Sequence, residues 1–184
     1  MTGPVITVSG PHGTGKSTYA KALAEALGLR YVCAGEIFRE LAKERGLSLA
    51  EFSQIAAKDP AIDKIIDERT KAEAKMGGVV IDAQLAAWMA RRVADVKVLI
   101  VAADEVRFKR IAEREGMSVL EAKRQTVARE SIQRERYRKY YGVDVTDLSI
   151  YDLTIDTGRY PIDEARSVVI ESVRDFIGKM RPKH

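Results

Sequence analysis

Cysteine is nearly missing from this chain of 184 residues, in which Cys33 is the single thiol. One cysteine cannot form an internal disulfide, which excludes the class of small secreted domains held together by disulfides and agrees with a reducing compartment. Cys33 follows Val32 in an apolar stretch, and this setting favours a small core residue over a nucleophile. We therefore expect a cytoplasmic protein.

Long apolar runs are also missing, because charged residues interrupt every hydrophobic stretch. A membrane-spanning helix needs about 20 consecutive apolar residues, so no span and no membrane partner are expected. The first residues lead directly into an apolar stretch and lack the basic and hydrophobic regions of a signal peptide. No repeat, low-complexity tract or linker divides the chain. Its length suits a single domain, which we expect to act as a monomer.

An aromatic platform for nucleic acid is the third absence. The formal net charge is +4, and much of the basic excess lies between Arg107 and Lys139. Such a basic stripe attracts nucleic acid, but clustered arginines also neutralise small phosphorylated substrates. Because no aromatic platform is interleaved with this stripe, the sequence favours small phosphate compounds over nucleic acid.

One complete motif stands out against these absences. Residues 10–17 read Gly-Pro-His-Gly-Thr-Gly-Lys-Ser, the pattern G-x-x-x-x-G-K-[ST], after an apolar run at 5–8 and before a helical pattern. In that context the loop amides and the helix N-terminus bind phosphate, Lys16 reaches the β- and γ-phosphates, and the Ser17 hydroxyl ligates Mg²⁺. The motif predicts that ATP and Mg²⁺ bind at Gly10, Pro11, His12, Gly13, Thr14, Gly15, Lys16, Ser17 and Thr18. His12 occupies a freely variable position, so we assign it no chemistry of its own.

Short β-rich runs alternate with helical patterns along the chain. This alternation predicts an α/β fold of three layers, in which helices flank a five-stranded parallel sheet on both faces. Gly28 is expected to end the first helix. The expected strands are residues 5–9, 30–33, 79–82, 96–102 and 152–156.

Residues 35–76 depart from this alternation and read as three short helices with no strand between them. Ser48–Glu51 form a capping box, and Asp59 precedes a proline at a first helical position. The segment is longer than an ordinary crossover, which makes it a candidate substrate-binding flap.

Asp82 ends the expected buried strand at 79–82. A carboxylate at the C-terminal end of a strand beside a phosphate loop holds Mg²⁺ directly or through water. The alternative is a helix N-cap or a loop salt bridge.

Directly after the second strand the chain reads Gly35-Glu-Ile-Phe-Arg39. This segment resembles the Gly-Asp/Glu-x-x-Arg motif of small nucleoside monophosphate kinases, in which the arginine grips the phosphate of the acceptor. A planar guanidinium suits that task because it binds phosphate oxygens in a bidentate manner. The resemblance implies that Gly35 and Arg39 bind the acceptor. Without it, Arg39 would be read as a solvated helix arginine.

The segment from Asp82 to Met89, Asp-Ala-Gln-Leu-Ala-Ala-Trp-Met, narrows the resemblance to archaeal-type cytidylate kinases. Residues 129–137, 141–144 and 147–153 are similar to the same family, so the likeness runs from residue 6 to residue 157. It implies a P-loop kinase fold with a core at 1–34, 77–112 and 143–184, a helical monophosphate-binding insert at 35–76, and a lid at 113–142.

Gln84 departs from the family pattern, Gly/Ser-Arg-Leu-Ala-Gly-Trp, at the place where an arginine is expected. A glutamine hydrogen-bonds a base or a phosphate but supplies no positive charge. We still assign Asp82 and Gln84 to the acceptor site. The missing charge must be compensated elsewhere, or the preference or affinity for the acceptor changes.

Four arginines are expected at the lid. Arg110 and Arg114 share a helix face, as do Arg129 and Arg136. The resemblance implies that lid arginines close over the transferring phosphoryl group, so the expected catalytic residues are Lys16, Arg129 and Arg136, with Arg110 and Arg114 at the donor nucleotide. The alternative is a solvated surface on which these arginines pair with Glu113, Glu130 and Glu135.

The predicted function is therefore transfer of the γ-phosphoryl group of ATP to CMP and dCMP. Two alternatives stay open: another acceptor on the same scaffold (AMP, UMP or shikimate), and an ATPase or switch associated with nucleic acid. The tyrosines at 137, 140 and 141 are expected to serve packing alone.

Overall fold

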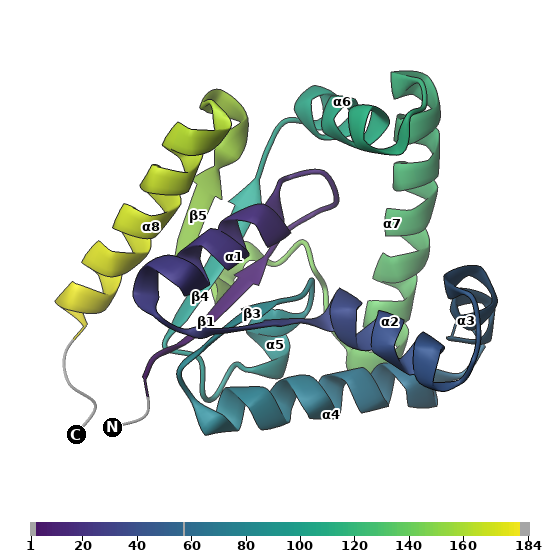
Figure 1. Ribbon diagram of the computed structural model, residues 1–184, viewed down its shortest axis with the longest axis horizontal. Coiled ribbons are helices and arrows are strands. Elements are labelled where there is room, and N and C mark those ends of the chain that lie inside the picture. Colours follow the sequence, from purple (N-terminus) through teal and green to yellow (C-terminus); the bar gives the residue numbers. More distant parts are fainter. Residues whose placement is uncertain (1–2, 57, 181–184) are drawn as a thin grey trace.

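The computed structural model describes residues 3–56 and 58–180. Its centre is a parallel sheet of five strands in the order β2-β3-β1-β4-β5 (Figure 1). The strands are β1 (Val5–Ser9), β2 (Arg30–Cys33), β3 (Val79–Asp82), β4 (Val96–Val101) and β5 (Leu153–Asp156). The predicted sheet is confirmed. Cys33 and Val8 both pair in register with Asp82, so the carboxyl ends of three strands meet at one edge.

Apolar residues of β1 and β3 alternate between the two faces of the sheet. On one face, Ile6, Val8 and Val80 pack with α1 (Lys16–Leu27) and α8 (Ile162–Lys179). On the other, Val5 and Ile81 pack with α4 (Pro60–Met76) and α5 (Ala86–Met89). A strand buried on both faces belongs to a sheet covered by helices, which gives the predicted three layers.

Residues 34–76 form the helical insert, with α2 (Ala34–Glu44), α3 (Leu49–Ala56) and α4. The predicted three helices are confirmed, although α4 has 17 residues and is not short. The Ser48 Oγ accepts the Glu51 N–H at 3.3 Å while the Ser48 N–H donates to Glu51 Oε2 at 2.9 Å, so the predicted capping box forms. The insert has its own apolar cluster, made of Ile37, Leu41, Ala42, Phe52, Ala56, Ile62 and Ile66.

Two helices connect β4 to β5: α6 (Asp104–Glu115) and α7 (Val119–Tyr141). Figure 1 shows α7 running from the end of α6, beside the phosphate loop, down to the insert. Only Ala122 and Thr126 of α7 are buried. Few apolar contacts hold this helix to the core, as expected of an element that moves. Short 3₁₀ turns at Leu148–Ile150 and Thr157–Arg159 flank β5. Within the described residues, no helix is long and apolar enough to cross a membrane.

Candidate active site

The phosphate loop joins β1 to α1 and depends on its glycines. Gly13 and Gly15 adopt φ angles of +81° and +83°, which disfavour any residue with a side chain. A Cβ at Gly13 would also lie 2.6 Å from the carbonyl oxygen of Arg107. The loop leads directly into the N-terminus of α1, where Gly15 is the N-cap residue and the helix dipole favours an anion.

A cavity of 330 Å³ opens over this loop. The structure brings together here most of the residues predicted to bind the donor nucleotide. Its lining consists of Pro11, His12, Gly13, Gly15, Lys16, Ser17, Thr18, Tyr19, Arg110, Ile111, Arg114 and Ile162. Thr14, also a loop residue, does not line the cavity because it is buried. Its Oγ1 donates to the carbonyl of Pro11 at 3.0 Å.

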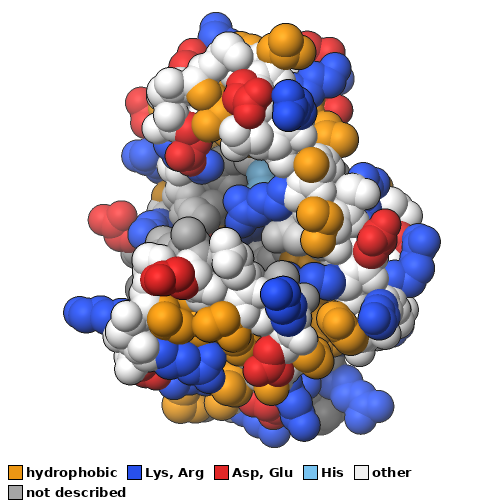
Figure 2. Space-filling model, turned by 90° about the vertical axis from the view of Figure 1, so that its right-hand side faces the viewer, with side chains coloured by type: hydrophobic (Ala, Val, Ile, Leu, Met, Phe, Trp, Pro, Cys, Tyr) orange, Lys and Arg blue, Asp and Glu red, His pale blue; other side chains and the backbone are white. Residues whose placement is uncertain are grey.

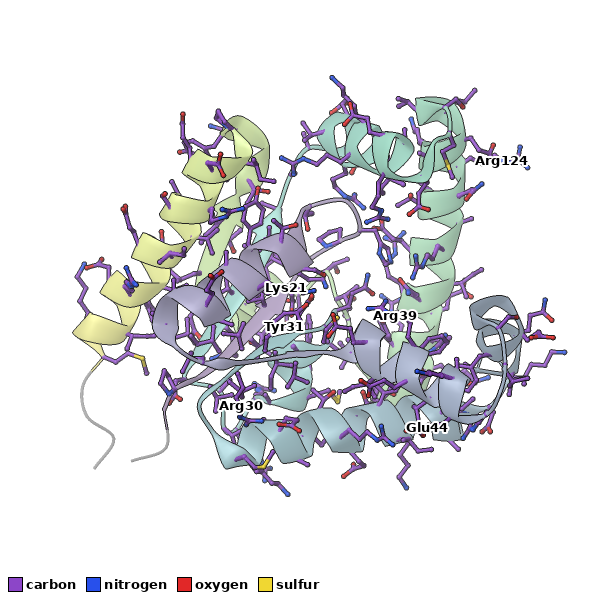
Figure 3. All side chains as sticks on the ribbon, viewed as in Figure 1. Lys21, Arg30, Tyr31, Arg39, Glu44 and Arg124 are labelled. Carbon is purple, nitrogen blue, oxygen red and sulfur yellow. The ribbon has the colours of Figure 1, made fainter. Side chains whose placement is uncertain are left out.

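Asp82 is fully buried at the end of β3, beside the loop lysine. Lys16 Nζ donates to Asp82 Oδ1, and the Tyr31 hydroxyl donates to Oδ2 at 2.8 Å. Burial and the Asp82 charge raise the pKa of Tyr31 well above its ordinary value, so the phenol stays a donor. Tyr31, which lies in β2 (Figure 3), was missed by the sequence analysis because only the sheet order brings it to Asp82.

Ser17 and Asp82 supply the hydroxyl and carboxylate oxygens that Mg²⁺ prefers. Among residues 3–56 and 58–180, no group of three or more His, Cys, Asp or Glu side chains could hold a metal ion by itself. The donor set fits an ion that takes its other ligands from phosphates and water, as Mg²⁺ does.

A buried arginine that the sequence analysis did not select fastens the loop to the helices above it. Arg107 Nε donates to the His12 carbonyl at 2.7 Å, and its other nitrogens bind Asp104 at 2.6 Å and Glu130. Glu130 Oε1 also accepts the His12 N–H at 3.0 Å. The expected alternative, in which Glu130 pairs with a lid arginine on the surface, is wrong, because its partners are Arg107 and the loop. Arg107 is the first residue of the basic stripe noted in the sequence. The spacing of the arginines along that stripe does not indicate which of them is buried.

Arg110 and Arg114 lie at the donor cavity, where they were predicted. Arg110 donates to the carbonyls of Thr14 at 3.3 Å and Thr157 at 3.0 Å, so it also braces the loop. Arg114 is exposed and pairs with its neighbour Glu115 at 2.9 Å. Their direct contact with a nucleotide stays a prediction.

A second cavity, of 750 Å³, lies between the insert, the end of β3 and α7. Figure 2 shows the surface hollowed between the α6–α7 end of the molecule and the insert, with Lys and Arg side chains over the hollow. It is lined by Ala34, Gly35, Phe38, Arg39, Ala56, Asp63, Ile66, Asp67, Ala83, Gln84, Leu85, Gln125, Arg129, Ile132, Gln133, Arg136, Tyr137 and Tyr141. The predicted residues Gly35, Arg39, Gln84, Arg129 and Arg136 therefore share one cavity.

The three arginines of this cavity differ in what holds them. Arg39 projects from α2 (Figure 3), is 55% exposed and lies 3.9 Å from Glu36. Arg129 makes no hydrogen bond or ion pair with any residue that the structure describes. Arg136 binds Asp63 on α4, and its buried Nε has no partner in the described part of the chain. Arg39 and Arg129 are thus the cations most available to a phosphate.

Two tyrosines expected to serve packing alone have polar roles in this cavity. The Tyr137 hydroxyl donates to Gln84 Oε1 at 2.8 Å, and burial raises the pKa of Tyr137 to about 12. The Tyr141 hydroxyl lies near Asp67, whose Oδ2 is buried without a hydrogen-bond partner in the described chain. Burial raises the pKa of Asp67. A run of tyrosines at a helix end carries no signal that separates packing from such roles.

Gln84 connects the two cavities. Its Nε2 lies 3.0 Å from Nε2 of His12, which in turn lies 2.9 Å from Oε1 of Gln133 on α7. The chain Gln133–His12–Gln84–Tyr137 therefore links the phosphate loop, the loop after β3 and α7.

Residues 5–159 match the model of the cytidylate kinase-like family. A cytidylate kinase of Aeropyrum pernix is 52% identical over 167 residues, which cover 91% of this chain and 97% of the relative. One of Staphylothermus marinus is 46% identical over 173 residues, covering 94% and 98%.

Among solved structures, a shikimate kinase from Bacteroides thetaiotaomicron superposes with a TM-score of 0.66 at 14% identity, covering 95% of this chain and 98% of that one. This likeness shows the fold alone and confirms the predicted P-loop kinase architecture. The phosphate loop, the helices of residues 34–76 and α7 occur together in a chain whose sequence matches cytidylate kinases over most of its length, and the chain therefore belongs to the cytidylate kinase-like family.

Proposed function

We propose that this chain transfers the γ-phosphoryl group of ATP to CMP, and also to dCMP, giving ADP and the nucleoside diphosphate. One observation carries the proposal. The phosphate loop and the 750 Å³ cavity, lined by Arg39 and Arg129, meet through the contact between His12 and Gln84. One site thus holds a triphosphate beside a second anionic nucleotide. The phosphoryl group can then pass directly between them, without a covalent enzyme intermediate.

The chain's own residues bind and orient the two nucleotides. The loop amides and Lys16 hold the β- and γ-phosphates, and Arg39 holds the acceptor phosphate, which brings the reacting oxygen in line with the γ-phosphorus. Arg129 neutralises charge on the transferring group. Closure of α7 excludes water that would otherwise attack ATP. Mg²⁺, when held by Ser17 and Asp82 together with the phosphates, neutralises charge on the phosphate oxygens.

The cavity wall between α4 and α7 favours cytosine over uracil. Cytosine presents an amino donor at position 4 and an acceptor at position 3, whereas uracil presents the reverse. Among the described residues, Asp67 Oδ2 and Arg136 Nε have no hydrogen-bond partner, and both side chains line this cavity. A site built for one hydrogen-bond pattern rejects the analogue that leaves its polar groups unpaired. In this arrangement Arg136 serves the base rather than the phosphoryl group.

An acceptor panel tests the proposal. ADP release is measured with ATP and Mg²⁺ alone, and then with CMP, dCMP, UMP, AMP or shikimate. We expect strong stimulation by CMP and dCMP. If only another acceptor stimulates ADP release, that compound is the substrate instead of CMP. If only RNA or DNA stimulates ADP release, the protein is an ATPase or switch associated with nucleic acid. We further propose that the chain acts as a monomer, because the residues that line each cavity come from one chain.

A further inference from the structure

Each polar group of His12 except the ring nitrogen Nδ1 has a hydrogen-bonding neighbour in this structure. These contacts fix the residue in the phosphate loop. Its N–H binds Glu130, its carbonyl accepts from Arg107, and its imidazole Nε2 lies between Gln133 and Gln84. So many contacts are not expected of a residue at a freely variable position of the loop. The contacts place the imidazole where the donor and acceptor cavities meet.

The hydrogen bonds around Nε2 suit more than one protonation state. Nε2 faces the Gln133 oxygen at 2.9 Å and the Gln84 amide nitrogen at 3.0 Å. The nitrogen of a neutral imidazole donates or accepts, so it satisfies only one of these neighbours. If the Gln84 amide rotates by half a turn, its oxygen faces His12 and its nitrogen donates to the Tyr137 hydroxyl. The protonated ring then directs its Nε2–H toward two amide oxygens.

Charged side chains from three helices face His12, and bound phosphates would change their combined effect on it. Arg129 and Glu130 face it from α7, Lys16 from α1 and Arg107 from α6. Burial lowers the pKa of His12 most, followed by the charge of Arg129, and Lys16 adds a small effect in the same direction. The hydrogen bond to Gln133 and the charge of Glu130 oppose this shift without reversing it. Bound phosphates would offset the positive charges of Lys16 and Arg129 and favour the imidazolium.

The residue at position 84 explains why a positive charge on His12 would matter. Its position in the loop after β3 is the one where the resemblance led us to expect an arginine, and its amide contacts His12 directly. We propose, on the basis of the kinase function above, that His12 takes up a proton when both nucleotides are bound and supplies, between their phosphates, the positive charge that Gln84 lacks. The residue then acts on kcat by stabilising charge and not by transferring its proton.

The chain offers a direct test because it contains only two histidines, His12 and His184. NMR of the histidine ring protons follows the titration of each in the empty protein, with Mg-ADP, and with Mg-ADP plus CMP, a pair that does not react. His12→Asn identifies the His12 signal, and His184 serves as an internal control. We expect the His12 midpoint to rise by about one pH unit or more, a tenfold gain in proton affinity, only when both nucleotides are bound.

An unchanged or lowered midpoint with both nucleotides bound would overturn the proposal for His12 and leave CMP phosphorylation standing. Failure of the nucleotides to bind, measured by calorimetry, would instead overturn the proposed function. The two failures are therefore distinguishable.

Kinetics provide a second readout. In the wild type, kcat for CMP should fall as the pH rises through the His12 midpoint of the loaded site. His12→Asn should lower kcat about tenfold near pH 6.5 and remove this decline. Gln84→Arg, which restores a permanent charge, should make kcat independent of the His12 proton. A wild-type pH profile in His12→Asn would contradict the assignment.

Discussion

The phosphate loop and the acceptor cavity lie side by side but differ in how their polar groups are occupied. At the loop, Lys16 pairs with Asp82, and Arg107 and Glu130 bind both sides of His12. In the cavity, Arg129 has no partner in the described chain, and neither does one oxygen of Asp67. The proposed donor side is thus held by contacts within the chain, whereas the proposed acceptor side has polar groups that lack such contacts in the described residues.

This contrast agrees with the different demands of the two binding steps, since the donor phosphates need only be held, whereas the acceptor must also be selected. Every phosphate tail is alike, so a rigid ring of amides serves any triphosphate. An acceptor must be distinguished from similar molecules, which requires groups whose hydrogen bonds are completed only by the correct one. Substitutions on the donor side should therefore abolish turnover or stability, and those on the acceptor side should change KM and selectivity.

The largest effect is expected from Lys16→Ala. The substitution removes the only lysine in the donor cavity lining and should lower kcat by about 10³-fold or more. Coupled measurement of ADP release with saturating CMP gives the value. Lys109→Ala, on the exposed side of α6, is the matched control and should leave kcat unchanged. Turnover of Lys16→Ala within a few-fold of the wild type would refute the donor assignment.

Arg107→Ala should destabilise the fold by about 3 kcal/mol, because it leaves the largely buried carboxylate of Glu130 and the His12 carbonyl without their cationic partner. Chemical denaturation measures the free energy of unfolding. Arg114→Ala on the same helix breaks an exposed pair and should cost less than about 1 kcal/mol. Equal losses in the two variants would mean that Arg107 does not fasten the loop.

Arg39→Ala should raise the KM for CMP about tenfold or more while kcat falls less, because a charge-assisted contact to the acceptor phosphate is lost. Initial rates at varied CMP and fixed ATP separate the two parameters. Lys43→Ala, an exposed cation on the same helix, is the control. An unchanged KM for CMP in Arg39→Ala removes that assignment.

Asp67→Asn should reduce the preference for CMP over UMP about tenfold, since an amide donates to the 4-carbonyl of uracil. The ratio of kcat/KM for the two acceptors measures it, with Glu68→Gln as the exposed neighbouring control. Burial raises the pKa of Asp67, so its carboxylate form is lost as the pH falls through that value. The KM for CMP should therefore rise at mildly acid pH in the wild type and stay flatter in Asp67→Asn.

Local signals predicted much of the fold. Gly28 ends α1 in a left-handed conformation at φ +62°, and Asp59 caps α4 by accepting the Ala61 N–H at 2.9 Å. These features depend on a few adjacent residues, so the sequence displays them. The loop motif likewise carries its own context, which is why the donor side could be predicted in detail.

The rest depends on contacts between distant segments. Arg107 and Glu130 are 23 positions apart, and His12 and Gln133 are 121 apart. No spacing rule joins such pairs, and the fold alone decides which of many arginines is buried. His12 was read as a residue without chemistry for the same reason, since its partners come from three separate elements.

The most direct measurement follows the γ-phosphate itself. ATP labelled at that phosphate is incubated with the protein, Mg²⁺ and CMP, and the products are separated. The proposed function predicts label in CDP, formed in equal amount with ADP and absent when CMP is omitted. Label appearing only as inorganic phosphate, at a rate independent of CMP, would contradict it.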